Sequence, residues 1–235
     1  MKPLASIEFS LVSINAVLSF DTAVKGEYYS FLRDFAPKFG KPNAEPRLLG
    51  PIDIIPNDLP WVTMDMGSVL GKWQVFKTRF SIEHAAGTGS MGNLPQLCNT
   101  ISDVFRAYVD SYPSRITRLG AVVRRVAVHD SPGMFLARHF CKEQWEKQPL
   151  NRPESFELHA HKTYMLKSGL KVNSWVRNKS ALQVVDKQAV VVVEQDINTV
   201  EGTDRALTAD DIGSYFQLTP AEFDRILGLY YPSEA

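Results

Sequence analysis

The stretch Ser155–Asn178, SFELHAHKTYMLKSGLKVNSWVRN, decides the fold class. Two runs in which apolar and polar residues alternate, 155–166 and 170–178, are joined by the tripeptide Lys-Ser-Gly. Alternation with a period of two is typical of strands, and a short glycine-containing turn between two such runs indicates a β-hairpin. Because the two strands of a hairpin are antiparallel, the sequence predicts an antiparallel sheet rather than the regular alternation of a doubly wound fold.

Further strands and helices are expected on both sides of this hairpin. Strands are predicted from their content of β-branched and aromatic residues: one or two within Ile7–Phe20, and one each at Trp61–Met66, Lys72–His84, Arg115–His129 and Ala189–Val200. Helices are predicted from apolar residues at helical spacing or from capping residues: Asp21–Phe39, Leu94–Tyr112, Gly133–Lys147, and two C-terminal helices capped at Thr208 and Thr219. Short extended pieces such as Ile52–Ile55 are expected inside a proline-rich loop, 41–60.

The predicted fold class is α+β, with a largely antiparallel sheet and helices packed mainly on one side of it. The predicted order is β-α-β-β-α-β, followed by a helix, three strands and two C-terminal helices. A chain of 235 residues with 44% hydrophobic content can bury a sizeable core. We expect one compact domain over 1–235, with a division into 1–147 and 148–235 as the alternative.

The charges are sorted along the chain, although the 26 basic and 26 acidic residues cancel overall. Residues 1–113 carry 10 basic and 11 acidic side chains, 114–180 carry 13 and 5, and 181–235 carry 3 and 10. A basic centre followed by an acidic end either neutralises itself in the fold or forms a surface for a charged partner.

Histidines and carboxylates on two predicted strands form a candidate site for a divalent metal, which is the only cofactor that the sequence suggests. Glu157, His159 and His161 fall on one face of their strand, and Glu194 and Asp196 fall on one face of another. Together they would suit a metal-dependent hydrolase, most plausibly a nuclease. The alternative is that the first segment is an ordinary half-exposed antiparallel strand and the second a polar strand end, in which case the chain holds no metal.

Basic residues form a second candidate site, which would contact nucleic acid or another partner. Its members are Arg115, Arg118, Arg124, Arg125, Arg138 and Lys142. Arg118 and Arg124 share one face of their predicted strand, and such a cluster can contact phosphates. The alternative is pairing with the acidic end of the chain, through residues such as Asp204, Asp210 and Asp211.

Several features together resemble a sporadically distributed family of bacterial proteins of about this length, which has no established activity. They are the strand that ends in Ala16–Phe20, the Trp73 strand, the helix that leads into Arg115–Gly120, and Glu194-x-Asp196 before a terminal helix. The resemblance implies a cytoplasmic bacterial protein and little else; the hypothesis of a role near defence or mobile-element loci rests on the sporadic distribution of the family alone.

The sequence contains no nucleophile elbow, P-loop or dinucleotide-binding motif. Its most apolar run, 189–193, is too short to cross a membrane, and the first residues do not form a secretory signal, so a cytoplasmic protein is expected. We therefore expect a non-catalytic binding or regulatory protein that acts through protein–protein contacts. The metal-dependent hydrolase and the nucleic-acid-binding protein are the alternatives.

Overall fold

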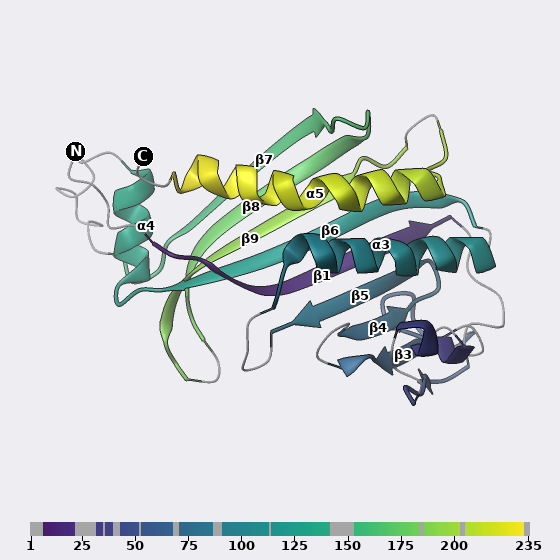
Figure 1. Cartoon of the computed structure of the whole chain (residues 1–235). Helices are drawn as coiled ribbons and strands as arrows, with labels where there is room; N and C mark the ends of the chain where they lie inside the picture. The colour runs from purple at the N-terminus through teal and green to yellow at the C-terminus, as the bar shows by residue number, and fades with distance from the viewer. Residues whose placement is uncertain are drawn as a thin grey trace.

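The computed structural model of the chain is built around one antiparallel sheet. The structure describes residues 7–21, 32–34, 36–39, 43–51, 53–67, 71–86, 91–112, 114–141, 153–183, 186–202 and 205–232. The strands in this part of the chain are β1 (Ser10–Phe20), β2 (Arg47–Leu48), β3 (Val62–Asp65), β4 (Lys72–Val75), β5 (Arg79–Ala85), β6 (Ile116–Val128), β7 (Glu157–Met165), β8 (Lys171–Leu182) and β9 (Ala189–Thr199). They pair in the order β2-β3-β4-β5-β1-β6-β9-β8-β7, with all neighbours antiparallel (Figure 1). The predicted α+β class, its antiparallel sheet and the β7–β8 hairpin are confirmed.

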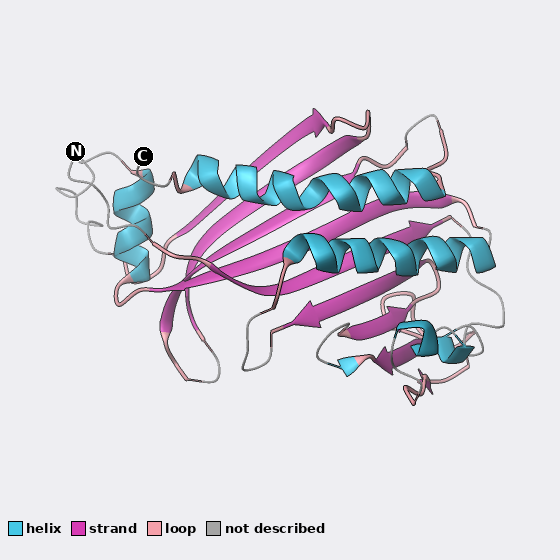
Figure 2. Ribbon diagram, in the orientation of Figure 1, coloured by secondary structure: helices cyan, strands magenta, loops and turns pink. Residues whose placement is uncertain are grey.

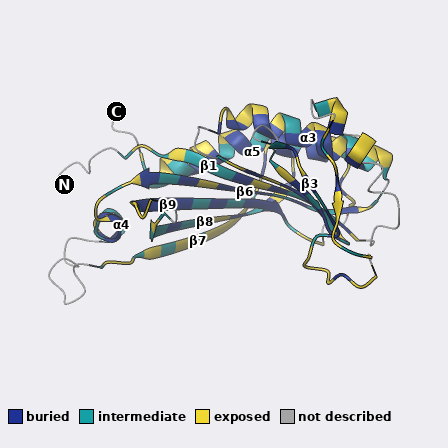
Figure 3. Ribbon diagram, turned by 90° about the horizontal axis from the view of Figure 1, so that it is seen from below, coloured by how far each residue is buried: buried dark blue, intermediate teal, exposed yellow. Residues whose placement is uncertain are grey.

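Two long helices cover one side of this sheet. The described helices are the 3-10 helix η1 (Ala36–Phe39), α3 (Leu94–Ser111), α4 (Pro132–Phe140) and α5 (Ala209–Tyr230) (Figure 2). Figure 3 shows α3 and α5 together on one side of the strands. Between the helices and the sheet lies an aromatic core in which the ring centroids of Phe80 and Phe105 are 5.3 Å apart and those of Phe105 and Phe216 are 5.6 Å apart. None of the described helices is long and apolar enough to cross a membrane.

The two halves of the chain repeat the same order of elements. The first half runs through β1, η1, β3, β4, β5 and α3, and the second through β6, α4, β7, β8, β9 and α5. From the centre of the sheet outward, the strand order is β1-β5-β4-β3 on one side and β6-β9-β8-β7 on the other. The short strand β2 has no counterpart among the described residues of the second half. Strands from both sides of residue 148 therefore belong to one continuous sheet.

The segment 72–84 forms two strands, and the prediction of one continuous strand was wrong. The backbone N–H of Phe76 donates to the carbonyl oxygen of Arg79 at 2.8 Å, which closes a tight turn between β4 and β5. Across this turn the buried positions change from odd (Trp73) to even (Phe80). The short strand in the proline-rich loop is β2, whereas Asp53 and Ile54 lie in a turn.

The chain closes with one helix, so the prediction of two C-terminal helices was wrong. Thr219 was expected to cap a separate helix, but it lies inside α5 and is fully buried. Pro220 has no backbone N–H and interrupts the hydrogen-bond ladder at that point. The helix continues because its buried side chains recur every three to four residues on both sides of the proline: Ile212, Tyr215, Phe216, Thr219, Phe223 and Ile226. The element order therefore differs from the predicted one at both places.

Other predicted elements lie wholly or partly outside the described residues. Most of the helix expected over Asp21–Phe39 falls in 22–31, outside the described residues; of its last part, residues 32–34 are α-helical and Ala36–Phe39 form η1. The second part of the helix predicted at 133–147 also lies outside the described range, which ends at Cys141.

The predicted cap at Thr208 is confirmed, and it forms a capping box in which Asp211 is the reciprocal acceptor. The Asp211 carboxylate accepts hydrogen bonds from the Thr208 backbone N–H at 2.8 Å and from two Arg205 guanidinium nitrogens at 2.6 and 2.7 Å. The Arg205 bonds are the main reason that the pKa of Asp211 falls to about 2.

Asp211→Ala is expected to lower the free energy of unfolding by about 1–2 kcal/mol at pH 7, because the Thr208 backbone N–H and the Arg205 guanidinium lose the carboxylate that accepts their hydrogen bonds. The folded-state pKa of Asp211 lies below its unfolded value, so this contribution is complete above about pH 4 and is lost as the pH falls toward 2. Urea titrations at several pH values measure the difference between wild type and variant. The matched control is Asp210→Ala, also in the first turn but outside the box, with an expected cost of about 0.5 kcal/mol. Equal costs for the two variants would contradict the prediction.

Candidate binding surface

The side of the sheet opposite α3 and α5 is here called the open face. On β6 and β9 the odd-numbered residues point toward α5: Arg125 contacts Asp224, and Gln195 donates to the Phe223 carbonyl oxygen at 2.8 Å. Successive side chains alternate across a strand, so even-numbered residues of β6 and β9 lie on the open face. The strand register extends this face to the odd-numbered residues of β8 and β7.

One row of residues across the open face is organised by Glu194. The register aligns His159 on β7, Arg177 on β8, Glu194 on β9 and Arg124 on β6. Glu194 accepts hydrogen bonds from Arg124 at 2.7 Å and from Arg177 at 2.6 Å, one on each carboxylate oxygen. The Glu194 side chain is only 12% exposed, whereas those of Arg124 and Arg177 are 48% and 37% exposed. Two guanidinium groups are thus held at the surface by one largely buried carboxylate.

The electrostatics of this row follow from that arrangement. Burial raises the pKa of Glu194, but the hydrogen bonds from the two arginines outweigh burial and hold the pKa below its usual range. Glu194 is therefore a carboxylate at neutral pH, and the three groups together carry one net positive charge.

The next row carries an exposed aromatic pair. The register aligns His161 on β7, Trp175 on β8 and Asp196 on β9. The rings of His161 and Trp175 stack with centroids 4.2 Å apart, and Trp175 is 36% exposed. Beside them, Asn173 accepts from the Thr163 hydroxyl at 2.9 Å, and Asn198 donates to Asp196 at 2.9 Å. A flat aromatic surface surrounded by hydrogen-bonded polar groups results.

The residues of the candidate metal site share the open face but do not form one cluster. Glu157 and His159 contact each other, with 2.6 Å between Oε1 and Nε2, and this bond is the main reason that the pKa of Glu157 is lowered. Glu194 and Asp196 lie two strands away on β9, at a backbone distance of about 9.6 Å, and β8 lies between the two sets. In the part of the chain that the structure describes, no group of three or more His, Cys, Asp or Glu side chains could hold a metal ion.

The residues of the candidate basic site are dispersed rather than gathered. Arg125 is buried beneath α5, where it bonds to Gln195 and, at 2.6 Å, to Asp224. Arg118 is on the open face and contacts Glu201 at 3.2 Å, and Arg115 lies 3.9 Å from Asp21. Arg138 is on α4, and Lys142 is outside the described residues.

Several of these arginines do pair with the acidic third of the chain, as one interpretation of the sequence had it. The partners are Glu194, Glu201 and Asp224. Of the residues that had been named as partners, Asp211 pairs with Arg205 instead, and Asp204 lies outside the described part. The charge available to a polyanion on the open face is correspondingly reduced.

Sequence reasoning missed Trp175 and Arg177, which lie on β8 between the candidate metal residues of β7 and those of β9. Their segment had been identified only as the second strand of the hairpin. The signal was present in the alternation: the open face of β8 carries Lys171, Asn173, Trp175, Arg177 and Lys179, while Val172 and Val176 are buried on the other face. A tryptophan within the polar series of an alternating strand indicates an exposed aromatic side chain.

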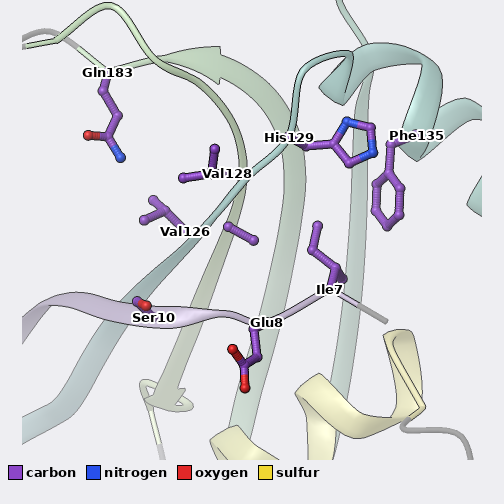
Figure 4. Close-up of a pocket in the computed structure, with 9 residues that line it drawn as sticks. Ile7, Glu8, Ser10, Val126, Val128, His129, Phe135 and Gln183 are labelled. Carbon is purple, nitrogen blue, oxygen red and sulfur yellow. The ribbon is translucent and has the colours of Figure 1, made fainter. Parts of the chain in front are cut away.

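A separate cavity of ≈510 Å³ lies at the end of β6, near the start of α4. Its lining includes Ile7, Glu8, Val126, Val128 and His129 (Figure 4). The His129 Nδ1 accepts the backbone N–H of Ser131 at 3.0 Å, and Figure 4 shows the Glu8 side chain pointing away from that imidazole. The two titratable groups of this cavity therefore do not form an acid–base pair.

A scan of protein-family models and a search of curated proteins find no match to this chain.

Proposed function

We propose that the chain is a non-catalytic binding protein that acts through protein–protein contacts, and that the open face carries these contacts. The observation that supports this most is the exposed Trp175 beside Arg177 on a broad sheet surface that α3 and α5 leave uncovered. Tryptophan and arginine are the residue types that most often dominate the binding energy of protein interfaces. The cytoplasm of a bacterium, in a defence or mobile-element context, is part of this proposal and rests on the family resemblance.

The matched charges of the open face favour a protein partner over a polyanion. Arg118, Arg124 and Arg177 each contact a carboxylate. A protein surface of mixed polarity can add to such pairs, whereas a polyanion would compete with Glu194 and Glu201 for the same guanidinium groups. Because Trp175 and Arg177 lie within the regular strand β8 rather than on a loop, they need little ordering upon binding.

The hydrogen bonds of the carboxylates favour binding over hydrolysis. Both oxygens of Glu194 accept from arginines, and Asp196 accepts from Asn198. Carboxylates used in this way act as fixed acceptors that orient neighbouring groups.

Trp175→Ala tests this proposal. The tagged protein, expressed at its native level, is used as bait, and recovered proteins are quantified by mass spectrometry. We expect Trp175→Ala to weaken retention of the main partner by about 30-fold, which corresponds to about 2 kcal/mol. The control is Leu229→Ala, which removes another exposed apolar side chain, 69% exposed, from α5 on the opposite side. Equal retention by the two variants would show that the open face does not carry the contact.

Nucleic-acid binding is the second candidate, and the composition of β8 favours it. Lys171, Arg177 and Lys179 share the open face with Trp175, and cations beside an aromatic ring suit a single strand. The ratio of absorbance at 260 and 280 nm of the purified protein distinguishes the candidates. A high ratio that falls after a wash at high salt would support this candidate over the protein partner.

A further inference from the structure

Among the described residues, no strand pairs with the outer edge of β7. β7 is the last strand in the order and pairs only with β8 in the described part of the chain. The Ser180 N–H donates to the Phe156 carbonyl oxygen at 3.0 Å, and the Leu166 N–H donates to the Leu170 carbonyl oxygen at 2.8 Å. Even-numbered residues of this segment therefore bond to β8.

The remaining backbone groups point outward because hydrogen bonding alternates along an antiparallel strand. They belong to the five odd-numbered residues of the strand: Glu157, His159, His161, Thr163 and Met165. The side chains of the same residues lie on the open face. The strand is nine residues long, or about 30 Å, so this edge is long enough to pair with another strand.

We infer that the occupant of this edge is β7 of a second copy of the chain, paired antiparallel about a two-fold axis. This inference does not depend on the proposed function. The first argument is that the opposite edge of the sheet is too short to pair with β7 along its length. It ends in β2, which is two residues long and follows Pro46, a residue without a backbone N–H. Of the described edges, β2 can therefore pair with only a small part of β7, whereas two β7 strands can pair along their full length and close as a dimer.

The second argument is the register. Centred on His161, the antiparallel pairing gives a partner to each of the five outward-facing residues, because His161 is the middle one. His159 then faces Thr163 of the second copy, and Leu158 faces Tyr164 of the second copy on the helix side, an apolar cross-strand pair. Lys162 faces Ala160 of the second copy, so that neither two lysines nor two carboxylates stand directly opposite each other.

The dimer also extends the aromatic row of the open face. His161 stacks on Trp175 within one copy at 4.2 Å. In the register centred on His161, the row runs from Trp175 and His161 to His161 and Trp175 of the second copy. The second copy thus contributes to the same surface, and the sheets join into one sheet of twice the width. One strand pair without a large apolar interface predicts a dissociation constant in the micromolar range, on the order of 10 µM.

The test is sedimentation velocity of the full chain from about 1 to about 100 µM. We expect wild type to pass from monomer to dimer over this range. His161→Pro removes an outward N–H that no described residue uses, and we expect it to raise the dissociation constant at least ~100-fold. His161→Ala removes the same side chain but keeps the N–H, so we expect a change of no more than ~5-fold. Thr163→Pro with Thr163→Ala repeats the comparison, and circular dichroism identifies any variant that has not folded.

Two results would overturn the inference. One is a wild type that stays monomeric at the highest concentration, and the other is a folded His161→Pro that dimerises like wild type. If the wild type stays monomeric but captures a protein partner, and the His161→Pro variant no longer captures it, the edge pairs with a strand of that partner and not with a second copy. The dimer and the proposed function fail separately, because Trp175→Ala tests partner retention and the proline variants test self-association.

Discussion

Trp73→Ala is expected to lower the free energy of unfolding by about 3–5 kcal/mol, the usual cost of removing a large aromatic side chain from a core. Trp73 on β4 is fully buried, and its ring lies between those of Phe39 and Phe80, with centroids 5.8 and 5.9 Å away. Alanine leaves a cavity there that the surrounding strands cannot collapse to fill. Because domains are stable by only about 5–15 kcal/mol, such a loss is a large share of the total. Urea unfolding followed by circular dichroism measures it.

The matched control is the other sheet tryptophan whose environment the structure defines. Trp175 is also at a strand centre, but it is 36% exposed and its main contact is the His161 ring. We expect Trp175→Ala to cost about 1 kcal/mol or less in stability. A loss at Trp73 no larger than that at Trp175 would mean that the core beneath α3 is not packed as described.

Gly71→Ala is expected to cost about 3 kcal/mol or more. Gly71 precedes β4 with φ of +67°, a conformation that side chains with a Cβ rarely adopt. A Cβ at this position would lie 2.1 Å from the Glu83 carbonyl oxygen and 2.7 Å from the His84 Cα. These are backbone atoms of β5, so the clash can be relieved only by moving a strand of the sheet.

Substitutions at two other glycines measure the cost of the positive φ angle without the steric clash that a Cβ meets at Gly71. Gly169 and Gly202 have φ of +83° and +77°, and a Cβ at either would meet no other atom within 4 Å. Alanine at either position is expected to cost only about 1 kcal/mol, from the strained backbone alone. Thermal unfolding of the three variants measures the difference. If Gly71→Ala unfolds at the same temperature as Gly169→Ala, β4 and β5 are not in the close approach described here.

The local pattern of apolar, turn and capping residues was enough to predict most strands and helices. It failed at the places where packing between distant segments determines whether an element continues or ends. The hairpin at 155–178, the helix after Asn93 and the strand at 116–128 each have a clear period and a turn or cap at the end. The turn between β4 and β5 has neither glycine nor proline. The only sign of it in the sequence is that the apolar residues change from odd-numbered to even-numbered positions. Pro220 normally indicates a helix start or break, but the burial of Tyr215, Phe216 and Phe223 on either side keeps α5 continuous.

The candidate residues could be assigned to strand faces from the sequence, but not to neighbours across the sheet. The spacing of Glu157, His159 and His161 correctly indicated a shared face. Strand order depends on contacts between segments far apart in sequence, and no local pattern contains it. The sequence therefore could not show that β8 separates these residues from Glu194, nor that Arg177 lies between them and is bonded to that carboxylate.

The position of β1 at the centre of the sheet has a consequence for how the chain folds as it is synthesised. β1 pairs with β5 on one side and with β6 on the other, and β6 begins only at Ile116. At a synthesis rate of roughly 5–20 residues per second, that partner follows the end of β1 by roughly 5–20 seconds. During this interval the first half has its own strands and α3, but the strand that ends up in the middle of the sheet is still an edge. The nascent chain therefore depends on its second half to protect the most central strand of the mature fold.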